Sequence, residues 1–186
     1  ENYELGERLR FAQRSQVYTA VRRADGLPVI VKVYPDDRAA DDRPRAQREF
    51  HILAKISSAS TPRAIEVYRG GERPALVIER LRGTNLRSHA AGQPFTVESF
   101  LDLARQIVGA LGDIHAAGVL HRDINPSNVM FDAAARRISI IDFGIALELG
   151  RTHSRSDLGV GTLAYIAPQQ TGRMDRDVDY PSDLYS

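Results

Sequence analysis

The chain contains no cysteine in its 186 residues. It can therefore form neither disulfides nor thiolate metal sites, although this leaves its compartment open. No apolar run is long enough to span a membrane, and the opening ENYELGERL does not resemble a signal peptide. A formal net charge of +1 gives no reason to expect a nucleic acid or a membrane surface as a partner. These absences favour a cytoplasmic globular domain.

Lysine is also scarce, because arginine fills almost every basic position and only Lys32 and Lys55 remain. Lys55 lies in a stretch that reads as solvated and needs no special explanation. Lys32 lies inside the apolar run LPVIVKVY, where a charge is costly unless it is paired. The sequence therefore predicts that this position requires a compact, paired ammonium group rather than a guanidinium.

The first part of the chain is predicted to be rich in β-strands. Asp25-Gly26 is a hairpin turn signal between two apolar segments, and Gly70-Gly71 separates two more. The predicted strands span 17–21, 28–34, 64–68 and 74–80. Between the two pairs, a helix is expected to start near Pro44 and to bury Phe50, Leu53 and Ile56. RLRGTN, residues 80–85, is the expected boundary between two lobes.

The second part of the chain changes to a helical period. Thr96 is the expected N-cap of a helix over 97–117, and Gly118 is suited to end it. The apolar positions of that helix are Phe100, Leu103, Ile107, Leu111 and Ile114. Two short strands, 128–131 and 137–142, are predicted next, followed by a polar, irregular loop beyond Gly144. The pattern indicates an α+β protein with a β-rich lobe and a mainly helical lobe.

Four features whose residue types are suited to catalysis follow one another along the chain. They are Lys32 in VIVK, Glu49 in REFHIL, Asp123 and Asn128 in HRDINPSN, and Asp142 in IDFG. Together they resemble the signature set of protein kinases, and the resemblance covers essentially the whole chain. It implies a bilobal protein-kinase-like fold, with a complete N-lobe over 1–80 and an incomplete C-lobe over 81–186. The closing TGRMDRDVDYPSDLYS resembles kinase domains at the start of large bacterial signalling proteins that also carry an ATPase module and a sensor histidine kinase.

The resemblance implies transfer of the γ-phosphate of ATP to a protein serine or threonine, with Mg²⁺ as a cofactor. Asp123 would accept the proton of the attacking hydroxyl, and Asn128 and Asp142 would bind Mg²⁺ through oxygen. Lys32 would hold the α- and β-phosphates, with Glu49 fixing its ammonium. Taken alone, Asp123 and Asn128 also fit a simple Asx-type turn around the intervening proline.

Further nucleotide contacts are implied by position in the same family pattern. Leu9 begins the segment that corresponds to the glycine-rich loop, and Glu79 to Leu81 correspond to the hinge, with Ile78 before it as the gatekeeper. Val17, Ile30 and Met130 match the residues that enclose the adenine ring, although each could simply belong to the core. His121 is expected to pack under Phe143. Arg122 is expected to bind a phosphate on the activation loop. Candidate phosphorylation sites there are Thr152, Ser154 and Ser156, in a serine-rich stretch that could equally be a solvated loop.

Three positions depart from the family pattern. LRFAQRSQV, residues 9–17, lacks the glycines whose amides approach phosphate, and only Arg10 or Arg14 could substitute by charge. Asn125 stands where lysine is usual in serine/threonine kinases, and losing one stabiliser of the transition state can cost about 10²–10³ in rate. Gln169 replaces the acid of the motif that closes the activation segment.

The end of the sequence suggests a fragment of a larger lobe. DLYS resembles the start of the central helix, with Asp183 supporting the HRD loop. The helix over 97–117 is then expected to expose an apolar patch, so that the chain by itself self-associates.

The leading interpretation is a protein serine/threonine kinase, whose protein substrate could be its own chain or a downstream domain. The second is a pseudokinase that regulates a neighbouring domain with little or no phosphate transfer. The third, a small-molecule phosphotransferase of similar fold, is disfavoured by GTLAYIAP, residues 161–168, which suits a peptide platform.

Overall fold

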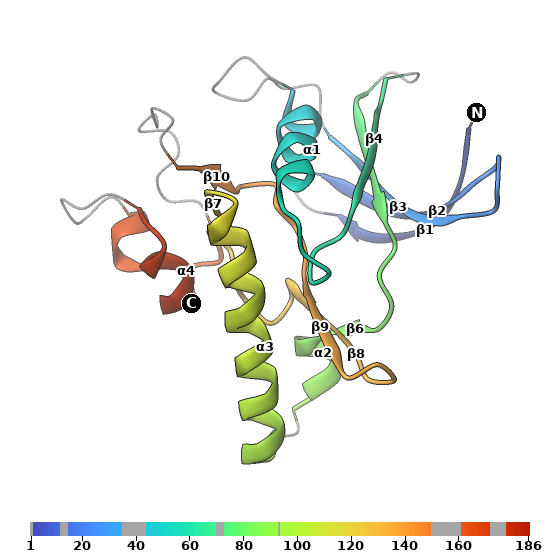
Figure 1. Ribbon diagram of the computed structural model, residues 1–186. Helices are drawn as coiled ribbons and strands as arrows, with labels where there is room; N and C mark the ends of the chain where they lie inside the picture. Colours follow the sequence, from blue (N-terminus) through green and yellow to red (C-terminus); the bar gives the residue numbers. More distant parts are fainter. Residues whose placement is uncertain are drawn as a thin grey trace. The chain divides into compact units, whose positions relative to one another are not determined.

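The computed structural model describes residues 2–11, 15–34, 44–69, 73–92, 94–149, 161–171 and 178–186. The chain forms two compact units (Figure 1). The first comprises Glu1–Ala54 and Pro62–Arg80, and the second comprises Lys55–Thr61 and Leu81–Ser186. The short segment 55–61 therefore belongs to the second unit.

A five-stranded antiparallel sheet forms the first unit, in the order β1-β2-β3-β5-β4. Its strands are β1 (Tyr3–Phe11), β2 (Gln16–Arg22), β3 (Pro28–Val33), β4 (Ala64–Tyr68) and β5 (Ala75–Glu79). The four predicted strands are confirmed. The sequence did not single out β1, because this edge strand is largely exposed and lacks a buried apolar alternation.

The turn between β2 and β3 has the predicted position. Gly26 adopts a φ of 71°, its amide donates to the carbonyl of Arg22, and Asp25 accepts from the guanidinium of Arg22 at 2.6 Å. One face of the sheet buries a cluster of Ala20, Val29, Val31, Ala75 and Val77. Because side chains alternate along a strand, Ile30 and Lys32 of β3 lie on the opposite face.

Helix α1 (Arg45–Lys55) starts directly after Pro44, as predicted. Leu53 and Ile56 are buried, but Phe50 is only partly buried, so the predicted apolar face is partly wrong. Ile52 and Glu49 complete the buried stripe instead. An acid was not expected among core positions, and its burial reflects the ion pair described below.

The second unit contains three helices, two small sheets and a 3-10 turn in its described part. The helices are α2 (Leu86–Ala90), α3 (Val97–Ala116) and α4 (Pro181–Tyr185), and the turn is η2 (Pro168–Thr171). One sheet has the order β6-β8-β9, from β6 (Thr84–Asn85), β8 (Val129–Asp132) and β9 (Arg137–Ile140). The other pairs β7 (Val119–Leu120) with β10 (Leu147–Glu148). The start of the predicted irregular loop is thus a short strand.

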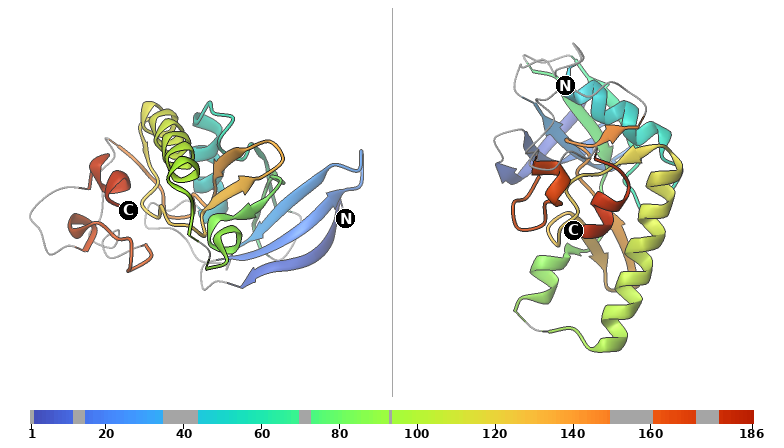
Figure 2. Two further views of the ribbon diagram at one scale, coloured as in Figure 1. Left: turned by 90° about the horizontal axis from the view of Figure 1, so that it is seen from below. Right: turned by 90° about the vertical axis from the view of Figure 1, so that its left-hand side faces the viewer.

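The long helix α3 packs on β7 and β9 and runs alongside the β8–β9 hairpin in both views of Figure 2. Thr96 caps it as predicted, accepting from the amide of Ser99 at 3.2 Å. Leu103, Leu111 and Ile114 are buried, whereas Phe100 is 57% exposed. The burial predicted for Phe100 is wrong because α3 makes its buried contacts through later turns. The expected apolar exposure is present, at Val97, Phe100, Leu101 and Val108.

Across the described residues, no helix combines the length and the apolar character needed to cross a membrane.

Candidate functional site

The first unit contains a buried ion pair between β3 and α1. The ammonium of Lys32 lies 2.6 Å from Oε1 of Glu49, and the side chains are only 6% and 2% exposed. The predicted pairing of Lys32 is therefore confirmed. The hydroxyl of Tyr34 donates to the second oxygen of the same carboxylate, a contact that sequence reasoning missed.

Two of the expected adenine contacts of the first unit, Val17 and Ile30, lie on the same face of the sheet as Lys32. Val17 pairs directly with Lys32 across β2 and β3, and Ile30 pairs with Ile78 across β3 and β5. Residues directly opposite in an antiparallel pair share a face. Val17 and Ile30 are partly buried on that face, whereas Leu9 of β1 is 53% exposed.

The hinge positions begin at Glu79, the last residue of β5, and Met130 lies in β8. The side chain of Glu79 is exposed and accepts from the amide of Arg63 at 3.3 Å. Leu81 and Met130 belong to the second unit and are both partly buried. Their proposed role in binding adenine stays a prediction.

The loop between β7 and β8 gathers polar groups around the carboxylate of Asp123. Its Oδ1 accepts from the amide of Thr162 at 2.9 Å and from the hydroxyl of Thr162 at 2.7 Å. Its Oδ2 accepts from Nδ2 of Asn128 at 2.8 Å. The backbone thus brings together residues that are 39 positions apart in sequence. Gly161 makes this approach possible, because a side chain there would meet the carbonyl of Arg122 at 3.0 Å and its φ of 131° is strained for other residues.

Asn125 is 6% exposed and lies at the centre of this loop. Its Nδ2 is within 3.1 Å of both the carbonyl and Oδ1 of Asp123, and 3.2 Å from the hydroxyl of Thr162. Its Oδ1 accepts from the amide of Ser127 at 2.9 Å. The residue that stands in the place of the usual lysine therefore uses its whole carboxamide within the loop.

Asn128 is 1% exposed and has one oxygen suited to a cation. Its Nδ2 donates to the carbonyl and the carboxylate of Asp123, both at 2.8 Å, which directs the amide nitrogen toward the loop. Within the described part of the chain, its Oδ1 is buried without a hydrogen-bond partner. A buried neutral oxygen of this kind is a ligand that Mg²⁺ accepts, so the residue fits the predicted metal role.

Asp142 follows β9 and is linked to Asn128 through the backbone. The amide of its neighbour Ile141 donates to the carbonyl of Asn128 at 2.9 Å. Asp142 has a φ of 71°, an uncommon conformation for a residue other than glycine. The described residues contain no group of three or more His, Cys, Asp or Glu side chains placed to hold a metal ion. The predicted magnesium ligands, Asn128 and Asp142, are one amide and one acid, so they do not form a group of that kind.

His121 packs under Phe143 as predicted. Its ring is fully buried and lies 4.8 Å from that of Phe143, at 71°, and its Nε2 lies 3.0 Å from the carbonyl of Ile141. It therefore belongs to the core below the loop.

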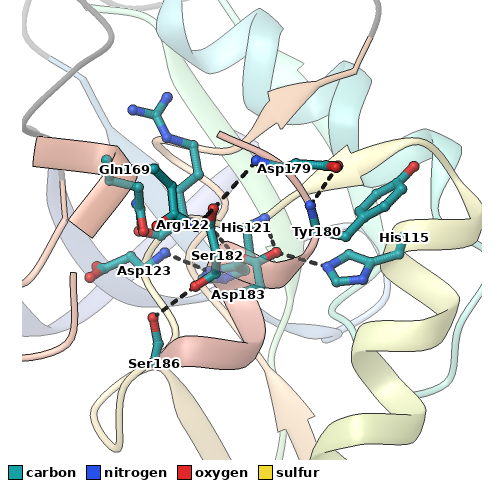
Figure 3. Close-up of polar contacts among 11 residues, drawn as sticks. His115, His121, Arg122, Asp123, Gln169, Asp179, Tyr180, Ser182, Asp183 and Ser186 are labelled. Atoms are coloured by element: carbon teal, nitrogen blue, oxygen red, sulfur yellow. Dashed lines mark hydrogen bonds and ion pairs between the residues drawn. The ribbon is translucent and has the colours of Figure 1, made fainter. Parts of the chain in front are cut away.

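Asp183 of α4 holds the backbone of the loop from below (Figure 3). Its carboxylate accepts from the amides of His121 at 2.9 Å and Arg122 at 2.7 Å, and lies 2.9 Å from Nε2 of His115. The support expected from Asp183 is confirmed. Burial by itself would raise the pKa of this carboxyl, but the hydrogen bond from His115, the neighbouring His121 and the two amides outweigh burial and lower it.

The conformation supported by Asp183 is itself unusual, because Arg122 also has a φ of 71°. Left-handed backbone at a residue with a side chain persists only where its surroundings hold it in place. The carbonyl of Arg122 accepts from Nε2 of Gln170 at 3.0 Å, which fixes the other side of the same residue. Gln170 is fully buried and was not predicted, since nothing in IAPQQ distinguishes the two glutamines.

Gln169, the predicted departure in the closing motif, has a neutral partner in α4. Its Nε2 lies 2.9 Å from the hydroxyl of Ser182, which is itself buried (Figure 3). A hydrogen bond between the turn η2 and α4 therefore forms at this position without any charge.

Several predicted residues lie outside the described chain. These are Ala12, Arg14, Gly70, Gly71, Thr152, Ser154 and Ser156, together with the side chain of Arg10. Lys55, for which no partner was expected, forms an ion pair with Glu148 of β10 at 3.0 Å.

The antiparallel sheet with its buried lysine–glutamate pair and the unit with the Asp123 loop define an α+β protein with a kinase-like fold. The chain belongs to the protein kinase domain family, whose model matches residues 3–186.

Three similar proteins are named as serine/threonine-protein kinases, which agrees with this family. The chain is 34% identical to the probable serine/threonine-protein kinase PkwA of Thermomonospora curvata, over 99% of this chain and 25% of that protein. It is 33% identical to the serine/threonine-protein kinase PknB of Mycobacterium tuberculosis, over 100% of this chain and 31% of PknB. It is 34% identical to serine/threonine-protein kinase A of Synechocystis, over 99% of this chain and 38% of that protein. The chain thus spans between a quarter and two fifths of the length of these relatives.

Proposed function

We propose that this chain is the phosphate-transferring domain of a protein serine/threonine kinase that uses ATP and Mg²⁺. The observation that carries the proposal is the loop in which Asn128 holds the Asp123 carboxylate with its nitrogen while keeping a buried oxygen unpaired in the described chain. The family match and the names of the relatives support the same activity.

Asp123 is the residue proposed to orient the attacking hydroxyl and accept its proton. Within the residues that the structure describes, its Oδ1 already receives three hydrogen bonds, from Asn125 and Thr162, whereas its Oδ2 receives one, from Asn128. Oδ2 therefore has the lone pair available to a substrate hydroxyl. A loose phosphoryl-transfer transition state is stabilised mainly by positioning of the reacting groups and little by covalent chemistry. The fixed Asp123 carboxylate would provide that positioning.

The residues proposed to bind the nucleotide are those that the family pattern implies. Lys32, held by Glu49, would contact the α- and β-phosphates, and Leu9, Val17, Ile30, Glu79, Leu81 and Met130 would contact the adenosine. Asn128 and Asp142 would hold Mg²⁺, which supplies neutralisation of phosphate charge when it is bound.

The proposed partner is a protein with an acceptor serine or threonine, which includes this chain itself and any domain that follows it in the full protein. A cytoplasmic location is part of the proposal, because ATP is the phosphate donor. No nucleic-acid partner is proposed, because the net charge is close to zero.

The test is transfer of labelled phosphate from Mg·ATP by the full-length protein, with Asp123→Asn as the matched variant. A basic protein and the protein itself serve as acceptors, and phosphoamino-acid analysis identifies the modified residue. Label on serine or threonine that disappears in Asp123→Asn is expected. Label on tyrosine, or equal label in the variant, would refute the proposal.

A pseudokinase is the second candidate, and Asn125 is the observation that favours it. Its carboxamide carries no charge and is used within the loop, so it adds no cation for the transferring phosphate. Binding of Mg·ATP without transfer by a folded, full-length protein would favour this alternative.

A further inference from the structure

Tyr34 follows β3 and lies two residues after Lys32. Its amide donates to the carbonyl of Pro74 at 3.1 Å, so the extended pairing of the sheet continues to this residue. Because side chains alternate along extended backbone, Tyr34 and Lys32 point to the same side of the sheet. The residue is 3% exposed, which places its hydroxyl in the interior of the first unit.

The Glu49 carboxylate receives one hydrogen bond from each of these two residues. Oε1 accepts from the ammonium of Lys32 at 2.6 Å, and Oε2 accepts from the hydroxyl of Tyr34. Glu49 is 2% exposed, so these bonds form where water does not compete. Hydrogen bonds to an ionised group are the stronger kind. Any movement of α1 that withdraws Glu49 must break both bonds at once.

We propose that Tyr34 is a positioning residue that holds Glu49 against Lys32 and thereby sets the affinity for nucleotide. The first half of this statement concerns only the first unit, whereas the second half rests on the proposed contact between Lys32 and phosphate. The two halves are therefore tested separately.

The scarcity of lysine provides a direct test of the first half. Acylation by an N-hydroxysuccinimide ester modifies lysine ammonium groups, and mass spectrometry resolves Lys32 from Lys55. Lys55 is 41% exposed and serves as the internal reference, whereas Lys32 is shielded. In Tyr34→Phe, loss of one hydrogen bond to the carboxylate is expected to raise the Lys32 to Lys55 labelling ratio about three- to tenfold.

Two comparisons separate positioning from general loosening. Tyr18→Phe removes a hydroxyl that bonds Gln16 at 2.7 Å in the same sheet, and it should leave the ratio unchanged. In a Glu49→Leu background, which offers no acceptor to the Tyr34 hydroxyl, Tyr34→Phe should add little, because its effect passes through the carboxylate. A ratio in Tyr34→Phe equal to that of the unmodified protein, or an equal increase in the Glu49→Leu background, would overturn the proposal.

The second half is tested by the dissociation constant of Mg·ATP, measured by calorimetry on the full-length protein. An increase in Tyr34→Phe that parallels the labelling ratio is expected, with Tyr18→Phe as the control. An unchanged dissociation constant despite a raised ratio would refute the link to affinity. If the unmodified protein binds no Mg·ATP, the proposed function fails, while the labelling result still decides whether Tyr34 positions Glu49.

Discussion

Replacing Asp183 should destabilise the second unit, because this carboxylate is the acceptor for two buried backbone amides. Asp183→Ala removes the acceptor for the amides of His121 and Arg122 and for Nε2 of His115. Asp183→Asn keeps the volume and one acceptor oxygen. Both changes also weaken the support of the left-handed backbone at Arg122, directly before Asp123.

The expected cost follows from the number of groups left unpaired. A buried amide without a partner costs about 1–3 kcal/mol, so two amount to about 2–6 kcal/mol in Asp183→Ala. This is a large part of the roughly 5–15 kcal/mol that stabilises a typical domain, so Asp183→Ala is expected to fold poorly. Asp183→Asn leaves one of the two amides paired and should cost about 1–3 kcal/mol. For a chain of this size that is a fall in Tm of about 2–12 °C.

The dependence on pH adds a second signature. Since the fold lowers the pKa of Asp183, its stabilising contribution is present above the ordinary carboxyl value near 3.9 and is lost as pH falls through the folded value. The difference in stability between the unmodified protein and Asp183→Asn should therefore be constant near neutral pH and shrink on acidification below about pH 4.

The assay is thermal unfolding followed by circular dichroism between pH 3 and 8, on the full-length protein. Asp179→Asn is the matched control, because the same chemical change falls on an exposed residue whose carboxylate accepts only from the amide of Tyr180 in the described chain. It should shift Tm by less than about 2 °C. If Asp183→Asn melts at the same temperature as Asp179→Asn at neutral pH, the account of Asp183 is wrong.

Three further changes test other parts of the structure. Asn125→Lys should raise the turnover number by adding a cation for the transferring phosphate, and should lower Tm because lysine cannot accept from the amide of Ser127; an unchanged or lower rate in a steady-state kinase assay would contradict the first part. Tyr3→Phe removes the hydroxyl that donates to Glu66. Burial, together with this hydrogen bond and the negative charge of Glu66, raises the pKa of Tyr3 from 10.0 to about 12. The fold therefore favours the neutral phenol, and the stability it contributes is present below pH 10 and lost toward pH 12. Chemical denaturation should show the unmodified protein losing more stability than Tyr3→Phe over that range, and parallel losses would refute this. Gly83→Ala would place a Cβ 2.1 Å from a carbonyl oxygen of β8 at a residue whose φ is 97°, so it should lower Tm by several degrees. Gly92→Ala, which has open space around the added Cβ, should lower Tm less. Equal shifts of Tm in the two variants would count against the packing argument.

Much of the secondary structure could be predicted because the local pattern and the tertiary packing agree. The strand that carries Lys32 and the helix capped by Thr96 have the expected bounds within a few residues. Strong turn and capping signals, such as Asp25-Gly26 and Thr96, mark those elements regardless of context. Where local signals are weak, as in the exposed edge strand β1, the sequence did not indicate the element.

Burial was less predictable than element type. Phe50 and Phe100 are apolar residues at plausible helical spacing, but neither is buried, whereas Glu49 is. Helical periodicity tells which residues share a face, while the neighbouring elements decide which face is covered. Glu49 is buried because Lys32 and Tyr34 bind both of its oxygens.

The sequence by itself determined the family, the order of the motifs, and the need of Lys32 for a partner, because these depend on residue type and spacing along the chain. Tertiary structure alone decided that Asn125 bridges Asp123 and Thr162, that Gln170 rather than Gln169 binds the carbonyl of Arg122, and that Tyr34 shares the Glu49 carboxylate. Each of those contacts joins residues through the orientation of a side chain in three dimensions. A hydrogen bond requires that the donor–acceptor distance be correct to within a few tenths of an ångström and that the donor point at the acceptor. No pattern in the sequence specifies either condition.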